Sequence, residues 1–399
     1  MQAYLLDWAN LLLRWSHVVF AIAWIGSSFY FVWLDNHLVP PTDDELKARG
    51  VDGELWAVHG GGFYNPQKYF VGPRRMPAGT LHWFYWESYS TWLSGFALFA
   101  LLYLWNASAF LVDKRVHDWT AAAAAVAAVA FLVAGWLVYD ALCRVLGRTR
   151  DGSVGHDLRV GVVVAACVAF ASWLACQLFA GRAAFLIVGA TLATIMSGNV
   201  LLRIIPGQRK VVADLQAGRA PDPVHGRRGK QRSVHNTYLT LPVLVAMLSN
   251  HYSLLYAHPR NGLVLAGLML FGALVRGVFV LRHKGPVRWP LVAGCVLLLA
   301  VLVVLVAPKE PQARNAGAAV PSFTQVQAVV QQRCVACHND QVSNKNVRLH
   351  TPELVRQHAQ QVLQQAVIAR TMPLNNATQM TEEERALLRQ WVDAGAPGP

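Results

Sequence analysis

Eight apolar runs constrain the fold of this chain more than any other feature. They lie at about residues 9–34, 81–104, 119–143, 160–181, 183–205, 237–257, 260–282 and 288–307. A helix that rises 1.5 Å per residue needs roughly 20 apolar residues to cross about 30 Å of hydrocarbon. Only 14% of the residues are charged, against roughly 25% in soluble globular proteins. The sequence therefore predicts an all-α fold whose residues 1–307 form a polytopic eight-helix membrane bundle.

The net charge of +13 is distributed unevenly between the connections. The first, third, fifth and seventh connections carry 19 Lys and Arg residues, and the even ones carry 4. Because basic loops stay in the cytoplasm, this asymmetry predicts a bacterial inner-membrane protein with both termini in the periplasm. The seven basic residues of connection 206–236 indicate topology and contact with a lipid membrane, not nucleic acid.

A CxxCH motif, formed by Cys334, Cys337 and His338, lies near the C-terminus. This spacing lets two thiols form thioether bonds to one haem, with the histidine as an axial ligand of the iron. A zinc site would need two further ligands, and the other four cysteines lie in or beside apolar runs. A redox dithiol would need a βαβ context. We therefore predict a covalent haem c on Cys334 and Cys337, with His338 bound to the iron.

The residues around this motif predict a small class I cytochrome c domain over residues 321–399. Capping-box pairs precede two expected helices, at Ser322 with Gln325 and at Thr381 with Glu384. Residues 308–320 contain Pro, Gly, Ala and charges without periodicity, and they predict a flexible linker.

The second axial ligand of that iron is predicted to be Met372. Pro373 follows it directly and would stiffen the loop that presents the sulfur. Met380 is the alternative, although it could equally pack at the start of the last helix. A His/Met ligand pair raises the reduction potential, which suits an electron acceptor.

Two membrane histidines lie at similar depths near the expected periplasmic face. At 1.5 Å per residue, His17 lies roughly 12 Å into the first span, and His251 lies roughly 9 Å from the end of the sixth. Facing imidazoles at one depth can bind a b-type haem between them, so we predict a haem b iron site here. The alternative is that each histidine only hydrogen-bonds a neighbouring helix.

A second group of polar residues lies near the expected cytoplasmic face. Polar residues are expensive inside a bilayer and mark functional sites; the group comprises His82, Glu87, Asn199, Arg203, His235 and Asn236. We predict a pocket for an anionic substrate here. Two alternatives remain: His82 and His235 hold another haem, or the group is an interfacial belt. Arg276, in the seventh span, either snorkels or pairs with Glu87 or Asp140.

The first cytoplasmic connection, residues 35–80, is unusually long. Its segment GELWAVHGGGFY alternates apolar and polar residues and then offers three glycines, which predicts a hairpin with a glycine-rich tip. The hairpin could act as a lid, with Tyr64 or His59 touching a ligand, or it could be a plain hairpin.

The chain resembles the membrane-bound urate hydroxylase (urate oxidase) family of the PuuD type. The resemblance rests on LLDWANLLLRWSHVVFAIAWIGSSFYFVWLDN, VHGGGFY, LHWFYWESYSTWLSGFALF, HNTYLTLPVLVAMLSNHY and the terminal CVACH, and it covers essentially the whole chain. It implies oxidation of urate to 5-hydroxyisourate in purine degradation. Electrons would leave through the cytochrome to a respiratory acceptor, such as a terminal oxidase or a soluble cytochrome, without forming hydrogen peroxide.

The polar residues are compatible with that implied substrate. Urate is a planar monoanion, which suits Arg203 with Asn199 and Asn236 as edge partners. A neighbouring histidine, His82 or His235, could accept a proton near neutral pH, with Glu87 nearby. A different function is also open: a membrane-anchored cytochrome that oxidises quinol or relays electrons without urate chemistry.

Overall fold

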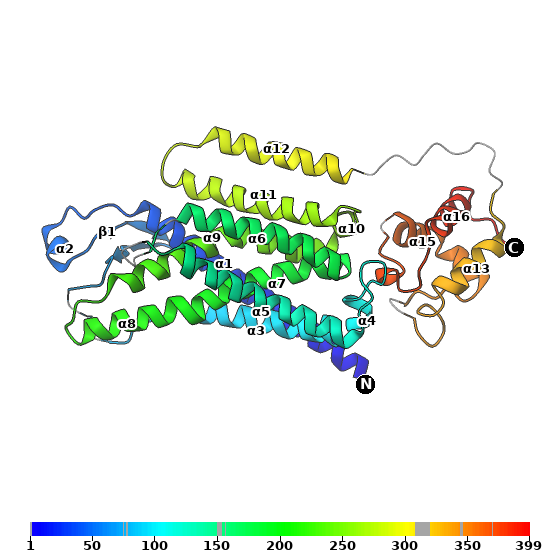
Figure 1. Ribbon diagram of the computed structural model, residues 1–399, viewed down its shortest axis with the longest axis horizontal. Helices are drawn as coiled ribbons and strands as arrows, with labels where there is room; N and C mark the ends of the chain where they lie inside the picture. Colours follow the sequence, from blue (N-terminus) through cyan, green and yellow to red (C-terminus); the bar gives the residue numbers. More distant parts are fainter. Residues whose placement is uncertain are drawn as a thin grey trace.

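Helices make up most of the protein in its computed structural model (Figure 1). The structure describes residues 2–74, 76, 79–149, 154–155, 157–307, 320–343, 346–368 and 370–399. The strands within these ranges are two or three residues long, so the prediction of an all-α fold is confirmed. The predicted linker 308–320 lies outside the described residues, except for Val320.

The first part of the chain is a bundle of long helices that run side by side (Figure 1). They are α1 (Gln2–His37), α3 (Trp86–Phe99), α5 (Ala121–Leu146), α6 (Asp157–Leu178), α7 (Gly181–Asn199), α9 (Pro223–Leu248), α11 (Asn261–Arg282) and α12 (Trp289–Val306). Helix α7 lies at the centre: Phe185 and Ile187 are fully buried, and α7 packs against α5, α6 and α9.

Six helices among the described residues are long and apolar enough to cross a membrane. They span Tyr4–His37, Ala121–Leu146, Asp157–Leu178, Gly181–Gln216, Asn261–Arg282 and Trp289–Val306. Their outward faces carry large exposed apolar side chains such as Leu158, Leu297 and Val304. A soluble protein rarely exposes such a large apolar area, so this is a multi-pass membrane protein.

The second and sixth predicted spans, residues 81–104 and 237–257, are helical, but they are not among the helices that are long and apolar enough to cross a membrane. Helix α3 has 14 residues and is continued by a π-helix, η1 (Ala100–Leu104). Helix α9 is long, but its first half is strongly polar. The count of eight membrane spans therefore remains a prediction.

The sixth span differs from its predicted bounds of 237–257. Helix α9 begins at Pro223, because Asp222 caps its N-terminus and proline is favoured in the first turn. It ends at Leu248 and is followed by a 3-10 turn, η3 (Ser249–His251), and by α10 (Ser253–Tyr256). His251 therefore lies beyond the end of α9, as the last residue of the 3-10 helix η3.

Short elements cover one end of the bundle, on the left of Figure 1. They are α2 (Asp44–Arg49), the pair β1 (Gly53–Glu54) with β4 (Gln67–Lys68), and the pair β2 (Ala57–His59) with β3 (Gly62–Tyr64). The β2–β3 pair is the predicted hairpin. Its tip residues Gly60 and Gly61 have φ of 59° and 80°, a conformation that favours glycine. We call this end of the bundle the hairpin end.

The C-terminal module, residues 320–399, has its own hydrophobic core. Its elements are α13 (Phe323–Arg333), α14 (Pro352–Gln357), α15 (Ala359–Val362), η5 (Leu363–Ile368), η6 (Leu374–Asn376) and α16 (Glu382–Asp393). Both predicted capping boxes are present, at the starts of α13 and α16. The core contains Val326, Leu388 and Trp391, which are fully buried. Helix α16 stops before Gly395, whose φ is 89°.

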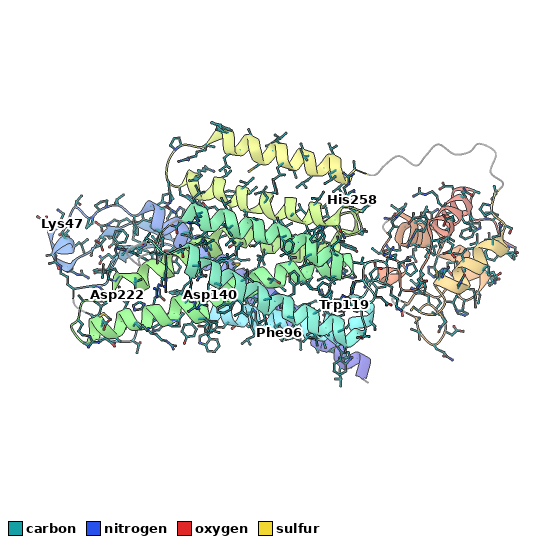
Figure 2. All side chains as sticks on the ribbon, in the orientation of Figure 1. Lys47, Phe96, Trp119, Asp140, Asp222 and His258 are labelled. Atoms are coloured by element: carbon teal, nitrogen blue, oxygen red, sulfur yellow. The ribbon has the colours of Figure 1, made fainter. Side chains whose placement is uncertain are left out.

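The C-terminal module contacts the end of the bundle opposite the hairpin. Asn375 of η6 donates a hydrogen bond to the carbonyl oxygen of Ala109 in α4 (Ala107–Phe110). We call this the module end of the bundle. In Figure 2, Lys47 and Asp222 mark the hairpin end, and Trp119 and His258 mark the module end.

Candidate functional site

A cavity of about 2040 Å³ runs through the bundle between α1, α3, α7 and α9. It reaches from Asp35 and Asp222 at the hairpin end to Arg14 and Arg182 at the module end. Its volume exceeds that of typical ligand pockets, roughly 300–1,000 Å³. The cavity is therefore large enough for a small substrate and further groups.

The predicted site residues divide between this cavity and two other places. His82 and Glu87 line the cavity near the hairpin end, and His17 and His251 line it nearer the module end. Asn236 also lies in its wall. The rest lie outside the wall: Asn199, Arg203 and His235 belong to a buried cluster, and Tyr64 is exposed on the hairpin.

The buried cluster is centred on Asp140 of α5, which is fully buried. Its carboxylate accepts hydrogen bonds from Arg203 Nε at 2.8 Å and Arg203 Nη2 at 2.5 Å, and from Arg232 Nη2 at 2.8 Å. Arg144 Nη2 lies 2.5 Å from the same carboxylate. Arg203 was predicted to bind an anionic substrate, but its guanidinium is already hydrogen-bonded to the Asp140 carboxylate.

An amide chain extends this cluster toward the cavity. Asn199 donates to the Tyr139 hydroxyl and to Asn236 Oδ1, both at 2.9 Å. The Tyr139 hydroxyl also lies 2.8 Å from His235 Nδ1. These contacts join α5, α7 and α9, so the Asp140 cluster mainly holds three helices together.

Arg276 has neither of its predicted partners. Its guanidinium lies over the Phe29 ring, 3.8 Å from the centroid, and its Nε and Nη2 atoms have no hydrogen-bond partner among the described residues. Asp140 is occupied by three other arginines, and Glu87 has no ion pair in the described part of the chain. A cation–π contact therefore replaces the expected salt bridge.

His17 is held by hydrogen bonds to α3. Its Nδ1 lies 3.1 Å from both the Thr91 carbonyl oxygen and the Ser94 hydroxyl. The ring packs against Gly95, where a Cβ atom would lie 2.8 Å from His17 Cε1. Histidines that bind metals commonly donate their second ring N–H to a carbonyl in this way, so His17 fits an axial ligand as well as a helix-to-helix contact.

His338 shows the same arrangement in the C-terminal module. Its Nδ1 lies 2.9 Å from the Val347 carbonyl oxygen, which leaves Nε2 as the nitrogen for a metal. Cys334 and Cys337 are free cysteines. The donor set therefore fits a covalently attached haem iron.

The chemistry of Cys334 does not favour the rival interpretations of this motif. Burial raises the pKa of its thiol to about 11, whereas a reactive redox thiol has a lowered pKa. No group of three or more His, Cys, Asp or Glu side chains is arranged for a metal ion in the ranges that the structure describes. A zinc site thus lacks its further ligands within those ranges.

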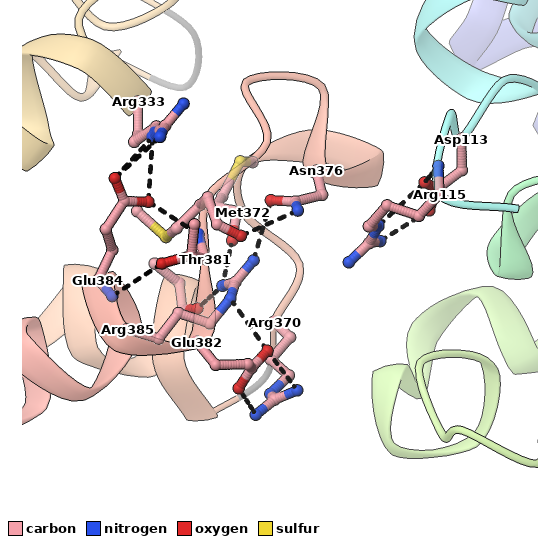
Figure 3. Close-up of polar contacts among 12 residues, drawn as sticks. Asp113, Arg115, Arg333, Arg370, Met372, Asn376, Thr381, Glu382, Glu384 and Arg385 are labelled. Carbon is pink, nitrogen blue, oxygen red and sulfur yellow. Dashed lines mark hydrogen bonds and ion pairs between the residues drawn. The ribbon is translucent and has the colours of Figure 1, made fainter. Parts of the chain in front are cut away.

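The two methionine candidates have different environments, and Figure 3 shows Met372 beside Arg385 and Asn376. Met380 is 3% exposed and belongs to the hydrophobic core of the module. Met372 is half-buried, and its loop is held by Arg385, which donates to the Met372 carbonyl oxygen at 3.0 Å and to Asn376 Oδ1 at 3.2 Å. This geometry favours Met372 as the residue that a loop presents.

A comparison with protein families identifies the membrane half. The family described as "Urate oxidase N-terminal" matches residues 3–307, which is most of the chain. The chain belongs to this family. The family description indicates an oxidoreductase that acts on urate. No curated protein and no solved structure matches the chain.

Two groups of polar residues were not predicted from the sequence to form sites. Asp140 was considered only as a partner for Arg276, although an acidic residue inside an apolar run is a strong signal of a buried network. The other group, at the module end of the cavity, contains Arg14, Arg182, Tyr103 and Asn250. The sequence gives no signal for the contact of Arg182 with Asn250, because the two residues lie on different helical segments.

Proposed function

We propose that this protein is a membrane-bound urate oxidase of the PuuD type, which converts urate to 5-hydroxyisourate and uses a haem c in its own C-terminal module. One observation carries the proposal. A urate oxidase family domain is joined in one chain to a CxxCH segment whose histidine is hydrogen-bonded as an iron ligand would be. The alternative, a cytochrome without urate chemistry, leaves the family match unexplained.

The reaction is balanced by water and by an electron acceptor. Urate and water give 5-hydroxyisourate, two protons and two electrons. When bound, the haem c would accept one electron at a time. A downstream respiratory acceptor would have to reoxidise it before it could take the second electron from urate. The protein residues have to hold the planar anion, exclude other reactions and accept a proton.

The cavity offers several groups that could accept the proton. His17 and His251 line it toward the module end, and His82 and Glu87 line it toward the hairpin end. Imidazole is suited to this role because it titrates near neutral pH. His235, by contrast, is hydrogen-bonded to Tyr139 and lies outside the cavity wall; we assign Arg203, Asn199 and His235 to support of the helices.

The haem c would be held by Cys334, Cys337, His338 and Met372. We expect Met372→Ala to lower the reduction potential of this haem, because a His/Met pair gives a high potential. Visible spectroscopy should also lose the sulfur-to-iron band while the haem remains covalently attached. A redox titration of the purified protein measures the shift.

Met380→Ala is the matched control for that prediction. It removes a core side chain, so it should lower the melting temperature of the module and leave the sulfur-to-iron band in place. The reverse pattern, with the band lost only in Met380→Ala, would show that the ligand assignment is wrong.

A second, non-covalent haem between His17 and His251 is part of the proposal. The hydrogen bond that His17 Nδ1 donates to the Thr91 carbonyl oxygen supports His17 as a ligand. The position of His251 gives weaker support to the haem, since His251 lies beyond the end of α9 and is exposed. Extraction of haem by type decides this point: haem b beside haem c supports the pair, and haem c alone excludes it.

The proposed location is a bacterial inner membrane, with eight spans and the module end in the periplasm. The uneven loop charges support this orientation. A reporter fused after Pro399 should be active only as a periplasmic enzyme. Activity only as a cytoplasmic enzyme would reverse the orientation.

Urate oxidation itself is tested in membranes that contain the full-length protein. Such membranes should consume urate and oxygen without releasing hydrogen peroxide, because the electrons leave through a respiratory acceptor. Cyanide, which blocks terminal oxidases, should stop the reaction. Peroxide formation that equals urate consumption would contradict the proposed electron path.

A further inference from the structure

We propose that the module end of the cavity binds the planar organic anion, through Arg14, Arg182, Tyr103 and Asn250. This inference rests on the proposed function, in which that anion is urate. It moves the substrate from the predicted residues near the hairpin end to the opposite end of the cavity.

Basic residues line both ends of the cavity, but carboxylates line only one of them among the described residues. Among the described lining residues, the carboxylates are Asp35, Glu87 and Asp222, and all three lie toward the hairpin end. There, Asp35 neutralises Lys68 at 2.5 Å and Lys230 at 2.9 Å. At the module end, Arg14 and Arg182 line the cavity, and neither forms an ion pair with a described residue. An anion at the module end would therefore meet two guanidinium groups and no carboxylate of a described lining residue.

Hydrogen bonds to neutral side chains hold the two arginines in place, so their positive charges are not neutralised by these partners. Asn250 Oδ1 accepts a hydrogen bond from the Tyr103 hydroxyl at 3.2 Å and from Arg182 Nε at 3.3 Å. Arg14 Nε donates to Asn10 Oδ1 at 2.7 Å. In both arginines the hydrogen bond to asparagine is formed by Nε, and the Arg182 side chain also interacts with the Tyr103 hydroxyl. A guanidinium held through Nε can offer its Nη donors to the edge of an anion.

The wall beside the arginines is aromatic. Phe99 and Tyr103 stack with centroids 5.8 Å apart, Tyr103 lies 5.5 Å from Phe110, and all three line the cavity. Tyr103 lies in the π-helix η1, a distortion that is frequent at functional sites. Aromatic ring faces, next to N–H groups that can donate hydrogen bonds to the edge of the ligand, suit a planar heterocyclic anion.

The C-terminal module lies over this end of the cavity. Phe110 of α4 lines the cavity, and the neighbouring Ala109 carbonyl oxygen accepts the hydrogen bond from Asn375. Asn375, in η6, follows Met372 by three residues in the sequence. An anion held at Arg182 is thus on the side of the bundle that faces the proposed electron acceptor. A substrate near Glu87 would be separated from it by most of the length of the helices.

The test is equilibrium binding of urate to the full-length protein in neutral detergent. The protein is reduced beforehand under argon, so that bound urate has no acceptor and is not consumed. We expect Arg182→Gln to raise the Kd for urate about ten- to hundredfold, the cost of a lost charge-assisted hydrogen bond. Arg182→Lys should lose less, because it keeps the charge without the planar fork.

Arg227→Gln is the matched control. Arg227 lines the same cavity at the hairpin end, and the substitution makes the same change in charge. Its Kd should stay within about twofold of the wild-type value. Equal effects of the two substitutions, or a larger effect of Arg227→Gln, would overturn the site assignment. If the wild-type protein bound no urate, the proposed function itself would fail, which is a distinct result.

A lipid phosphate is the other anion that two arginines could bind at this depth. Binding is therefore repeated after addition of phosphatidylglycerol in mixed micelles. Little competition by the lipid supports a site for urate. If Arg182→Gln lost co-purifying phospholipid but bound urate normally, the arginines would serve the lipid and the proposal would be wrong.

Discussion

The double substitution Cys334→Ser with Cys337→Ser is expected to remove all covalent haem from the protein. Both thioether bonds require these sulfur atoms, and the other four cysteines lie in the membrane half. A haem stain of the denatured chain should fall to background, and urate consumption by membranes should fall at least a hundredfold, because the proposed acceptor is absent.

The single substitution Cys337→Ser is the graded control, since one thioether can still hold the haem. Any haem left in the double variant is non-covalent and should be lost in His17→Ala if the proposed haem b exists. Undiminished urate oxidation by the double variant would remove the C-terminal module from the mechanism. That outcome would leave the family assignment intact.

Asp140→Asn is expected to destabilise the membrane half by about 3–5 kcal/mol. The substitution leaves the buried guanidinium of Arg232 without its anion, and an uncompensated buried charge has a cost of this order. Arg203 loses its bidentate partner in the same step. Thermal unfolding of the purified protein in detergent measures the loss.

Arg144→Gln is the control for this prediction. The Arg144 side chain is 55% exposed, so its ion pair with Asp140 is screened and should contribute no more than about 1 kcal/mol. If Asp140→Asn melted like the wild-type protein but bound urate weakly, the Asp140 cluster would belong to the substrate site. Our assignment of the cluster to helix packing would then be wrong.

Features that depend on neighbouring residues in the sequence could be predicted. The capping boxes at Ser322 and Thr381 are present, and the glycine-rich hairpin forms where its alternation indicated. The bundle helices follow the apolar runs, because the need to bury apolar surface or place it in lipid acts on each run separately. The end of α9 at Leu248 was missed, since Ser249 to Tyr252 are compatible with either a helix or a turn.

The grouping of the polar residues could not be predicted, because it depends on how each helix is rotated about its axis. Residues at similar depths were assumed to meet, yet Glu87 faces the cavity while Arg203 faces Asp140. A rotation of one residue, about 100°, decides between these partners. The pairing of Arg182 with Asn250 depends on two segments that are 68 positions apart in the chain.

The most direct test of the account is the reaction of the purified, oxidised protein with urate under argon, with an excess of an oxidised soluble cytochrome c as the one-electron acceptor. Added urate should reduce the haem c, and two molecules of the soluble cytochrome should be reduced for each urate converted to 5-hydroxyisourate. Arg182→Gln should slow this reduction at low urate concentration, while a small artificial reductant should reduce the variant normally. Reduction by ubiquinol and not by urate would contradict the account and identify the chain as a quinol-oxidising cytochrome.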